Sequence, residues 1–207
     1  MKVVVQCIPD RLEYIKNVCA DLDPHIHVDT EMKGPLPAFL DMLDYKHKGY
    51  QLYLQDDVIL ADDFHTYLST IENIAEMVEA DVLCLYMPNQ KVVRQMYANG
   101  GTIQPLKTCD WWIQGTVFSP RFLNLLRKEK AQGSWKQTKP AYSVDNWLTY
   151  VVCKKHNLRV FQHVPGIVQH NLEDLKSSIG HATSSQRVST MYHADYITNR
   201  NEALSKK

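Results

Sequence analysis

The chain has 207 residues, 44% of them hydrophobic, and it carries 23 basic and 23 acidic residues. That length suffices for one substantial core and is ordinary for a single domain. No run of about 18 apolar residues predicts a membrane span, and five scattered cysteines without a C-x-x-C pair favour neither a disulfide framework nor a cysteine zinc site.

The first 87 residues alternate between strand and helix patterns. Apolar runs typical of strands cover residues 1–8, 25–29, 50–60 and 82–87. Apolar residues at helical spacing cover residues 10–22, 35–45 and 64–79, and we expect Asp62 or Asp63 to cap the last helix. This alternation predicts an α/β fold in which helices cover both faces of a mostly parallel, Rossmann-like central sheet.

Beyond residue 88 the pattern is less regular. We expect a turn near residues 97–103, a strand over 111–118 that Gly115 interrupts, and a polar loop over 131–142. Helices are predicted over residues 121–130 and 144–155, and short strands over 159–163 and 166–170. The chain is polar from residue 171, so we expect one domain over residues 1–181 and a loosely ordered polar tail over 182–207.

Two adjacent carboxylates, Asp56 and Asp57, stand near the end of the apolar run that begins at Tyr50. In open α/β sheets, ligands bind in the crevice outside the carboxyl ends of the strands. Hard oxygen ligands at such a place suit Mg²⁺ or Mn²⁺, which complete their shells with phosphate oxygens and water. A surface turn is the alternative interpretation, because turns favour Asp.

The charges are unevenly shared along the chain. Residues 1–120 carry 9 Lys and Arg against 17 Asp and Glu, and residues 121–207 carry 14 against 6, so the two parts have net charges of −8 and +8. The basic part suits a polyanion such as nucleic acid or the phosphates of a donor, and solvated surface lysines are the plainer alternative. The first residues turn polar too soon for a secretory signal, so we expect a soluble cytoplasmic protein without membrane insertion.

Several common motifs are absent from the sequence. It has no G-x-G-x-x-G, no G-x-x-x-x-G-K-[ST], no G-x-S-x-G and no H-E-x-x-H. Dinucleotide oxidoreductases, P-loop enzymes, common serine hydrolases and zincin proteases therefore lose support. Metal-assisted phosphate chemistry remains.

The order of these elements resembles that of the GT-A-fold glycosyltransferases, in particular bacterial or phage ones, which use nucleotide-sugar donors and a divalent metal. Six segments carry the resemblance: VVVQCIPDR at 3–11, QDD at 55–57, WWIQGT at 111–116, SVDNW at 143–147, VPGIVQH at 164–170 and SSIGH at 177–181. Gln55 stands where a strict D-x-D motif has its first Asp, as in E-D-D variants of the family.

The resemblance implies roles for the polar residues of these segments. Asp57 and His170 would hold Mn²⁺ or Mg²⁺, with Asp56 as a further ligand, although a lone histidine after an apolar strand is also typical of a core residue. Asp145 would be the catalytic base that accepts the proton of the acceptor hydroxyl, which implies inversion at the sugar. His163 is more typical of a structural histidine.

The resemblance also implies which residues line the two substrates. The donor would contact Ile8, Pro9, Arg11, Gln55, Asp56, Gly115 and His181. Trp111 and Trp112 would lie at the acceptor, and because neighbouring strand residues face opposite sides, one of them can stack on a sugar or a base. By family frequency the donor is a UDP-sugar.

The acceptor hydroxyl is left open by the sequence. A hydroxylated base in phage DNA is one possibility, and a surface glycan or a protein side chain are the others. Paired carboxylates and histidines also serve nucleotidyltransferases and metal-dependent phosphohydrolases, and a non-catalytic module that binds nucleotides or nucleic acid is a further alternative.

Overall fold

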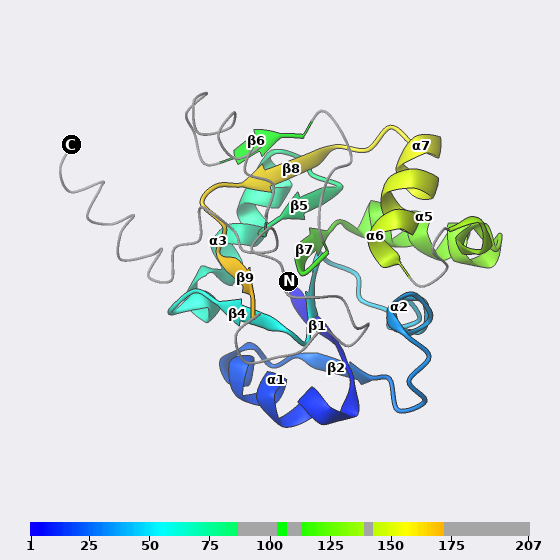
Figure 1. The fold of residues 1–207 in the computed structure, drawn as a ribbon. Coiled ribbons are helices and arrows are strands. Elements are labelled where there is room, and N and C mark those ends of the chain that lie inside the picture. Colours follow the sequence, from blue (N-terminus) through cyan, green and yellow to red (C-terminus); the bar gives the residue numbers. More distant parts are fainter. Residues whose placement is uncertain (87–102, 107–112, 139–142, 172–207) are drawn as a thin grey trace.

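A computed structural model describes residues 1–86, 103–106, 113–138 and 143–171 (Figure 1). Its strands are β1 (Lys2–Cys7), β2 (His25–Val28), β3 (Gln51–Gln55), β4 (Val58–Leu60), β5 (Val82–Cys84), β6 (Ile103–Pro105), β7 (Gly115–Phe118), β8 (Val160–His163) and β9 (Val168–His170). Its longer helices are α1 (Leu12–Val18), α2 (Pro35–Met42), α3 (Phe64–Met77) and α5 (Pro120–Ala131). Shorter helical segments are η1 (Pro9–Arg11), η2 (Ala20–Leu22), η3 (Ser134–Gln137), α6 (Val144–Asn146), η4 (Trp147–Val152) and α7 (Cys153–Lys155).

Seven of the described strands form one sheet in the order β2-β1-β3-β7-β5-β8-β6. The pairs β1–β2, β1–β3 and β5–β8 are parallel, whereas β7 is antiparallel to both β3 and β5, and β6 is antiparallel to β8. Five of the seven strands therefore run in one direction, which confirms the prediction of a mostly parallel sheet. The carboxyl ends of β1 and β3 lie at the same edge.

Two apolar clusters cover the two faces of this sheet, as the period-2 alternation along β1 illustrates. Val3 and Val5 belong to the cluster that contains α1 and α3, and Val4 belongs to the cluster that contains α2, α5 and η4. Figure 1 shows α3 on one side of the sheet and α2, α5 and α6 on the other. The predicted α/β architecture with helices on both faces is confirmed. None of the described helices is both long and apolar enough to span a membrane.

The strand predicted over residues 50–60 is two strands. Asp56 and Asp57 form a turn between β3 and β4, where their carboxylates meet polar partners that a strand between two apolar clusters would not offer. β4 leaves the main sheet and pairs with β9 as a separate antiparallel ribbon, in the register Val58↔His170 and Leu60↔Val168. The predicted strand over 166–170 is therefore not a neighbour of β8 in the sheet.

Three helix predictions also differ from the structure in detail. The helix expected over residues 10–22 is divided into η1, α1 and η2, and the one expected over 144–155 passes through the π-helical turns of η4. Asp63 is at the N-cap of α3, but its φ is 53° and its side chain makes no capping hydrogen bond. The expected turn at 97–103 lies almost wholly outside the described residues, as does the tail over 182–207.

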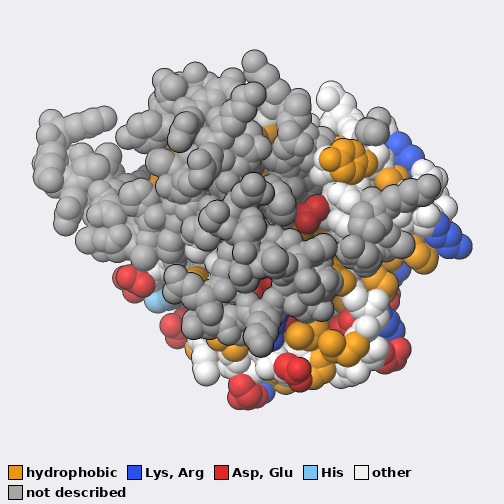
Figure 2. All heavy atoms as spheres, in the orientation of Figure 1, with side chains coloured by type: hydrophobic (Ala, Val, Ile, Leu, Met, Phe, Trp, Pro, Cys, Tyr) orange, Lys and Arg blue, Asp and Glu red, His pale blue; other side chains and the backbone are white. Residues whose placement is uncertain are grey.

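The opposite charges of the two parts of the chain meet in the folded structure. Arg121 and Arg159 both bind the acidic first part, at Asp81 and Glu79 respectively. Lys130 Nζ on α5 lies 2.8 Å from Asp44 Oδ1. In Figure 2, basic side chains are visible at the right margin, where α5 and α7 lie, and acidic ones along the lower margin near α1. Three basic residues of the second part are thus paired with acidic residues of the first part.

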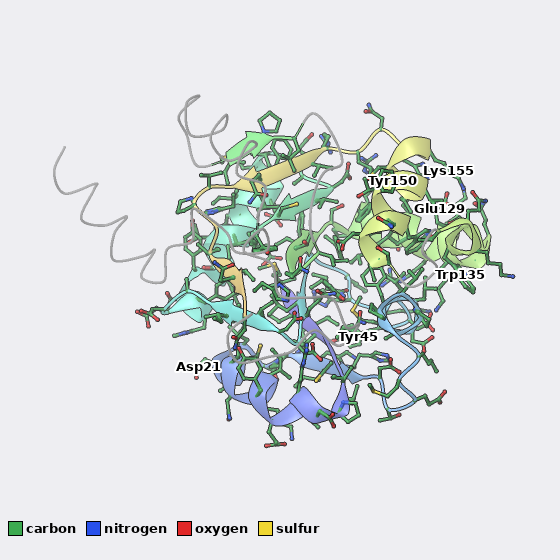
Figure 3. All side chains as sticks on the ribbon, viewed as in Figure 1. Asp21, Tyr45, Glu129, Trp135, Tyr150 and Lys155 are labelled. Atoms are coloured by element: carbon green, nitrogen blue, oxygen red, sulfur yellow. The ribbon has the colours of Figure 1, made fainter. Side chains whose placement is uncertain are left out.

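Glu129 on α5 is a buried carboxylate with partners from the following helices. It is 3% exposed, and its oxygens lie 3.0 Å from Lys155 Nζ and 2.9 Å from His156 Nε2. Figure 3 shows Glu129 and Lys155 close to each other on α5 and α7. Burial alone would raise the pKa of Glu129, but hydrogen bonds from His156, Lys155 and Ser134 lower it to about 2.

Candidate active site

The turn between β3 and β4 places Asp56 beside the loop that follows β1. Asp56 Oδ2 accepts a hydrogen bond from the backbone N–H of Ile8 at 2.7 Å, and Asp56 Oδ1 accepts one from Arg11 Nη1 at 2.8 Å. Asp56 is 7% exposed and Arg11 6% exposed. Because β1 and β3 are parallel neighbours, their following loops meet at one edge, and this buried ion pair joins them.

Asp57 lies against His170, which reaches it through the β4–β9 ribbon. The register places His170 opposite Val58, and His170 Nε2 lies 2.9 Å from Asp57 Oδ2. The same carboxylate oxygen accepts a longer hydrogen bond from Arg11 Nη1, at 3.2 Å. The structure therefore brings together four residues that the sequence pointed to: Arg11, Asp56, Asp57 and His170.

The two carboxylates are in different electrostatic environments. Burial raises the pKa of Asp56 despite the Arg11 guanidinium beside it. Burial also acts to raise the pKa of Asp57, but the hydrogen bond and charge of His170, together with the charge of Arg11, outweigh it and lower that pKa below its ordinary value. Asp57 is therefore held as the ionised carboxylate that a metal ligand must be.

The atoms around Asp57 fit a divalent cation. Within the described residues, Asp57 Oδ1 and His170 Nδ1 are buried without a hydrogen-bond partner. Neighbouring ligands of an octahedral Mg²⁺-type cation, each at roughly 2.1 Å, stand about 3.0 Å apart, and Asp57 Oδ2 and His170 Nε2 are 2.9 Å apart.

Asp57 and His170 are the two side chains best placed to share such a cation. Both oxygens of Asp56 already accept hydrogen bonds. In the described part of the chain, no three His, Cys, Asp or Glu side chains gather as a metal site. Any cation held by these two side chains would need its remaining ligands from water or a bound ligand, and Mg²⁺ in proteins commonly takes them from water and phosphate oxygens.

Asp145 lies in the first turn of α6, which Ser143 caps by accepting a hydrogen bond from the backbone N–H of Asn146 at 3.2 Å. Asp145 Oδ1 accepts a hydrogen bond from the backbone N–H of Ile113 at 3.1 Å, just before β7. It is partly exposed. The strand β7, which pairs with β3, thus connects the Asp145 region with the turn that carries Asp57.

A buried tyrosine on β3 links the two ends of the site. Tyr53 is completely buried and its hydroxyl donates a hydrogen bond to Gln6 Oε1 at 2.6 Å. Burial, together with the negative charges of Asp145, Asp56 and Asp57, raises its pKa well above the ordinary value. The pairing of Leu54 with Gly115 brings the start of β7, two residues after Ile113, beside the end of β3, so Asp145 lies toward the same end of the sheet as the Asp56–Asp57 turn.

Three other residues expected at the donor, Pro9, Gln55 and Gly115, lie at the ends of elements that border the site. Pro9 begins η1, directly after Ile8, whose N–H binds Asp56. Gln55 ends β3, and its backbone N–H donates to Gln114 O at 3.3 Å. Gly115 begins β7, where an added Cβ would lie 2.7–2.8 Å from three atoms of Val168. Gly115 is therefore required for the packing of β7 against β9.

His181, Trp111 and Trp112 lie outside the described residues. His163 is fully buried, with Nδ1 2.8 Å from Pro165 O and Nε2 3.2 Å from the Tyr67 hydroxyl, which agrees with the structural role expected for it.

Sequence reasoning missed two residues beside the site, Tyr14 and Asn171. The Tyr14 hydroxyl donates to Val58 O at 2.7 Å and accepts from Asn171 Nδ2 at 2.9 Å. Neither residue belongs to a motif. The helical position of Tyr14, one turn after Arg11, was the one available signal.

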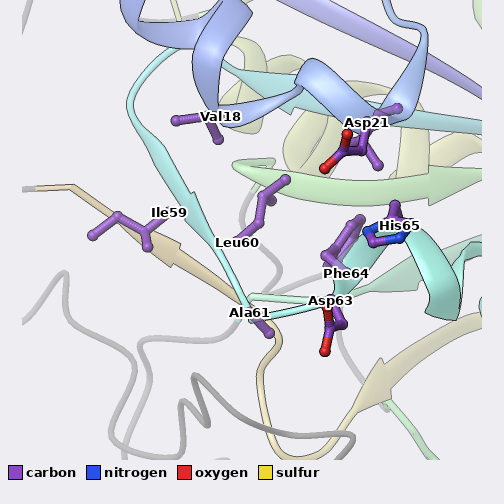
Figure 4. A pocket seen from close by; sticks show the side chains of 9 residues that line it. Val18, Asp21, Ile59, Leu60, Ala61, Asp63, Phe64 and His65 are labelled. Atoms are coloured by element: carbon purple, nitrogen blue, oxygen red, sulfur yellow. The ribbon is translucent and has the colours of Figure 1, made fainter.

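A shallow groove of about 260 Å³ opens next to β4 and α3 (Figure 4). Its lining combines apolar residues, among them Val18, Leu22, Leu60 and Phe64, with the polar residues Asp21, Asp63 and His65. None of the residues of the candidate active site lines this groove.

No protein-family model matches the chain, and no curated protein sequence matches it. Solved structures with a similar course of the chain include a glycosyltransferase involved in the glycosylation of the major capsid of PBCV-1, with 8% identity, a TM-score of 0.48 and full coverage of both chains. S. aureus TarS 1-349 has 12% identity and a TM-score of 0.47, over 80% of this chain and 58% of that one.

A nucleotidyltransferase is also among these similar structures. The inositol-1-phosphate CTP transferase from T. maritima has 11% identity and a TM-score of 0.42, over 86% of this chain and 73% of that one. Similarities of this size do not assign a reaction to this chain.

Proposed function

We propose that this protein is a metal-dependent glycosyltransferase, which transfers a sugar from a nucleotide-diphosphate sugar, preferably a UDP-sugar, to an acceptor hydroxyl. The observation that carries the proposal is the buried Asp57–His170 contact of 2.9 Å at the carboxyl end of β3, with an unpaired Asp57 Oδ1. It supplies two ligands and leaves the other positions of a cation to a diphosphate. The order of sequence motifs resembling the GT-A glycosyltransferases supports the same reaction.

Asp57 and His170 would hold Mn²⁺ or Mg²⁺ in this proposal. When bound, such a cation neutralises the charge that develops on a departing diphosphate, which is worth several kcal/mol in related metal sites. The lowered pKa of Asp57 keeps its carboxylate ionised for this purpose. Asp56 has a different part: its ion pair with Arg11 and its bond to Ile8 hold the loop after β1 against the metal turn.

Asp145 would accept the proton of the acceptor hydroxyl as it attacks the sugar. The Ile113 N–H and the cap of α6 by Ser143 fix its position. A carboxylate base is suited to this step, because the hydroxyl proton becomes acidic only as the bond to the sugar forms. A base on the acceptor side of the donor favours attack from the opposite face to the leaving group and so inversion.

The choice of acceptor depends in part on how many basic residues are free to bind an anionic acceptor such as DNA. DNA as an acceptor was suggested by the +8 charge of residues 121–207. Three of these cations, Arg121, Lys130 and Arg159, bind acidic groups of the first part of the chain. The acceptor therefore stays open among a glycan, a protein hydroxyl and a hydroxylated DNA base. Steep salt dependence of acceptor binding would favour DNA, and binding that is insensitive to salt would favour a glycan or a protein hydroxyl.

The nucleotide products distinguish this proposal from its alternatives. Incubation with UDP- and GDP-sugars and Mn²⁺ should release nucleoside diphosphate when an acceptor is present. Incubation with a nucleoside triphosphate and a sugar phosphate would release pyrophosphate from a nucleotidyltransferase. A non-catalytic binding module would be stabilised by nucleotide in thermal unfolding without releasing either product.

Substitutions test the two roles separately. Asp57→Asn should abolish the thermal stabilisation by Mn²⁺ and lower turnover by roughly 100-fold or more. Asp145→Asn should lower turnover by a similar factor while Mn²⁺ still stabilises the protein. Asp62→Asn, at an exposed position after β4, is the matched control and should behave as the wild type. Near-normal turnover in Asp57→Asn would refute the metal site, and near-normal turnover in Asp145→Asn would remove that residue as the base.

A further inference from the structure

The β4–β9 ribbon that carries His170 has little stability of its own. It has two strands and three residue pairs, and it is separate from the main sheet. Even a two-stranded hairpin, whose strands a turn joins, is marginally stable in water, and no turn joins β4 to β9. The position of His170 relative to Asp57 must therefore depend on groups outside the ribbon.

One end of the ribbon is fixed by the main sheet. The backbone N–H groups of Ile167 and Val168 both donate to Leu85 O, at 3.0 and 3.3 Å, directly after β5. Val168 also packs on Gly115 of β7. These contacts hold the beginning of β9, two to three residues away from His170.

The other end, beside His170, is held by a group of hydrogen bonds that centres on Tyr14 and Asn171. The backbone N–H of Asn171 donates to Asp57 O at 2.7 Å. Asn171 Nδ2 donates to the Tyr14 hydroxyl at 2.9 Å, and that hydroxyl donates to Val58 O at 2.7 Å. The Tyr14 oxygen thus accepts from one strand end and donates to the other.

The geometry points to Tyr14 and Asn171 as positioning residues that hold His170 against Asp57. Asn171 is 2% exposed and follows His170 directly, so a shift of Asn171 shifts the imidazole. Tyr14 lies on α1, which begins directly after Arg11. The Arg11 guanidinium binds Asp57, and the Tyr14 hydroxyl binds the carbonyl of the next residue, Val58. The inference rests on the proposed function in that the pair it positions is the proposed cation site.

The test uses Tyr14→Phe, which keeps the ring and removes the hydroxyl, and Asn171→Ala, which keeps the backbone N–H. Tyr50→Phe is the matched control, because the Tyr50 hydroxyl also donates to a backbone oxygen, but to that of Ala75 on α3, at 3.4 Å, and not to the ribbon. Two quantities are measured on the full chain: amide hydrogen exchange without metal, and the affinity for Mn²⁺ alone by calorimetry.

We expect amide exchange at residues 58–60 and 168–171 to become roughly 10-fold faster in both variants, while residues 3–6 of β1 stay protected. Tyr14→Phe removes the hydrogen bonds to Val58 O and from Asn171 Nδ2, and Asn171→Ala removes the second of these. Mn²⁺ affinity should fall roughly 10-fold or more, as for other groups that orient a metal ligand. The double variant should be no worse than the poorer single variant, since both substitutions break the same connection. Tyr50→Phe should change neither quantity.

Two results separate this inference from the proposed function. Wild-type protein that binds no Mn²⁺ would refute the proposed cation site, and the exchange data would still decide whether Tyr14 and Asn171 hold the ribbon. Unchanged exchange at residues 168–171 in both variants would overturn the inference, and so would wild-type Mn²⁺ affinity in both.

Discussion

Gly115 offers a direct test of how closely β9 is packed against the sheet. A Cβ added at Gly115 would lie 2.7, 2.8 and 2.8 Å from three atoms of the Val168 side chain, whereas ordinary contact begins at 3.4 Å. Val168 must therefore move by about 0.6–0.7 Å in Gly115→Ala. Both residues are buried, and β9 is held to Leu85 by backbone hydrogen bonds, so the displacement cannot be absorbed by a flexible surface side chain.

The expected cost follows from measured overpacking in other cores. An extra methyl group in a well-packed interior costs about 1–3 kcal/mol. For a chain of this size each kcal/mol lowers the Tm by about 2–4 °C, so Gly115→Ala should unfold about 2–12 °C below the wild type. Mn²⁺ affinity should fall as well, because Val168 lies two residues before His170 in β9.

A second substitution makes the test specific. Val168→Ala alone should cost roughly 2 kcal/mol from the lost buried carbons and the cavity. In the double variant the new methyl group fills part of that cavity, so its cost should be lower than the sum of the single costs by roughly 1–2 kcal/mol. Gly49→Ala is the control, since its Cβ would meet the imidazole of His47, which can rotate away.

The alternative role of Gly115, close approach to the donor sugar, has the opposite signature. If that role is correct, Gly115→Ala keeps the wild-type Tm and lowers only the affinity for the donor. Adding Val168→Ala then restores neither stability nor donor affinity. Thermal unfolding of the four proteins, followed by donor KM, decides between the two roles.

Three further predictions follow from buried groups. Glu129 has a pKa of about 2 in the folded protein, below the ordinary 4.5. Its carboxylate therefore stabilises the fold fully above pH 4.5, and this stabilisation is lost as the pH falls toward 2. Glu129→Gln should remove this part of the pH dependence of the Tm. Burial raises the pKa of the Cys7 and Cys19 thiols to about 12. Iodoacetamide at pH 8 should therefore label these thiols only after denaturation. Rapid labelling of the native protein would contradict their burial. Asp81→Ala should cost about 1.5–3 kcal/mol, because it removes a buried carboxylate that accepts hydrogen bonds from the exposed Arg121 guanidinium and from the Arg159 N–H. Glu13→Gln in an exposed pair should cost less than about 1 kcal/mol, and denaturant unfolding measures both costs.

The sequence was sufficient for the α/β architecture because helical and strand periodicities each reflect burial on one or two faces. The carboxylates of Asp56 and Asp57 were recognised because charge interrupts an apolar run. The different hydrogen-bond partners of these two carboxylates could not be predicted. They depend on Arg11, which is 45 residues away from Asp56 in the sequence and contacts it only in the folded chain.

The strands that depart from the expectation do so through long-range pairing. A strand period is the same for parallel and antiparallel neighbours, so nothing in the sequence distinguishes β7 from the parallel strands beside it. In the same way, the apolar residues of β9 predict a strand without showing that it pairs with β4 outside the main sheet. Tyr14 and Asn171 meet across 157 positions of sequence, and no local pattern foretells such a contact.

The position of β7 between β3 and β5 also constrains how the protein can be made. When a ribosome has released the first 86 residues, β1, β2, β3 and β5 exist, but the strand that links β3 to β5 has not emerged. Until residues 115–118 emerge, the edges of β3 and β5 that β7 joins stay unpaired, and the other edge of β5 waits for β8 at residues 160–163. Unpaired strand edges are where aggregation begins in slowly folding β-containing proteins. The sheet can therefore close during translation only after both strands have emerged, and chaperone dependence should last until the later one is released.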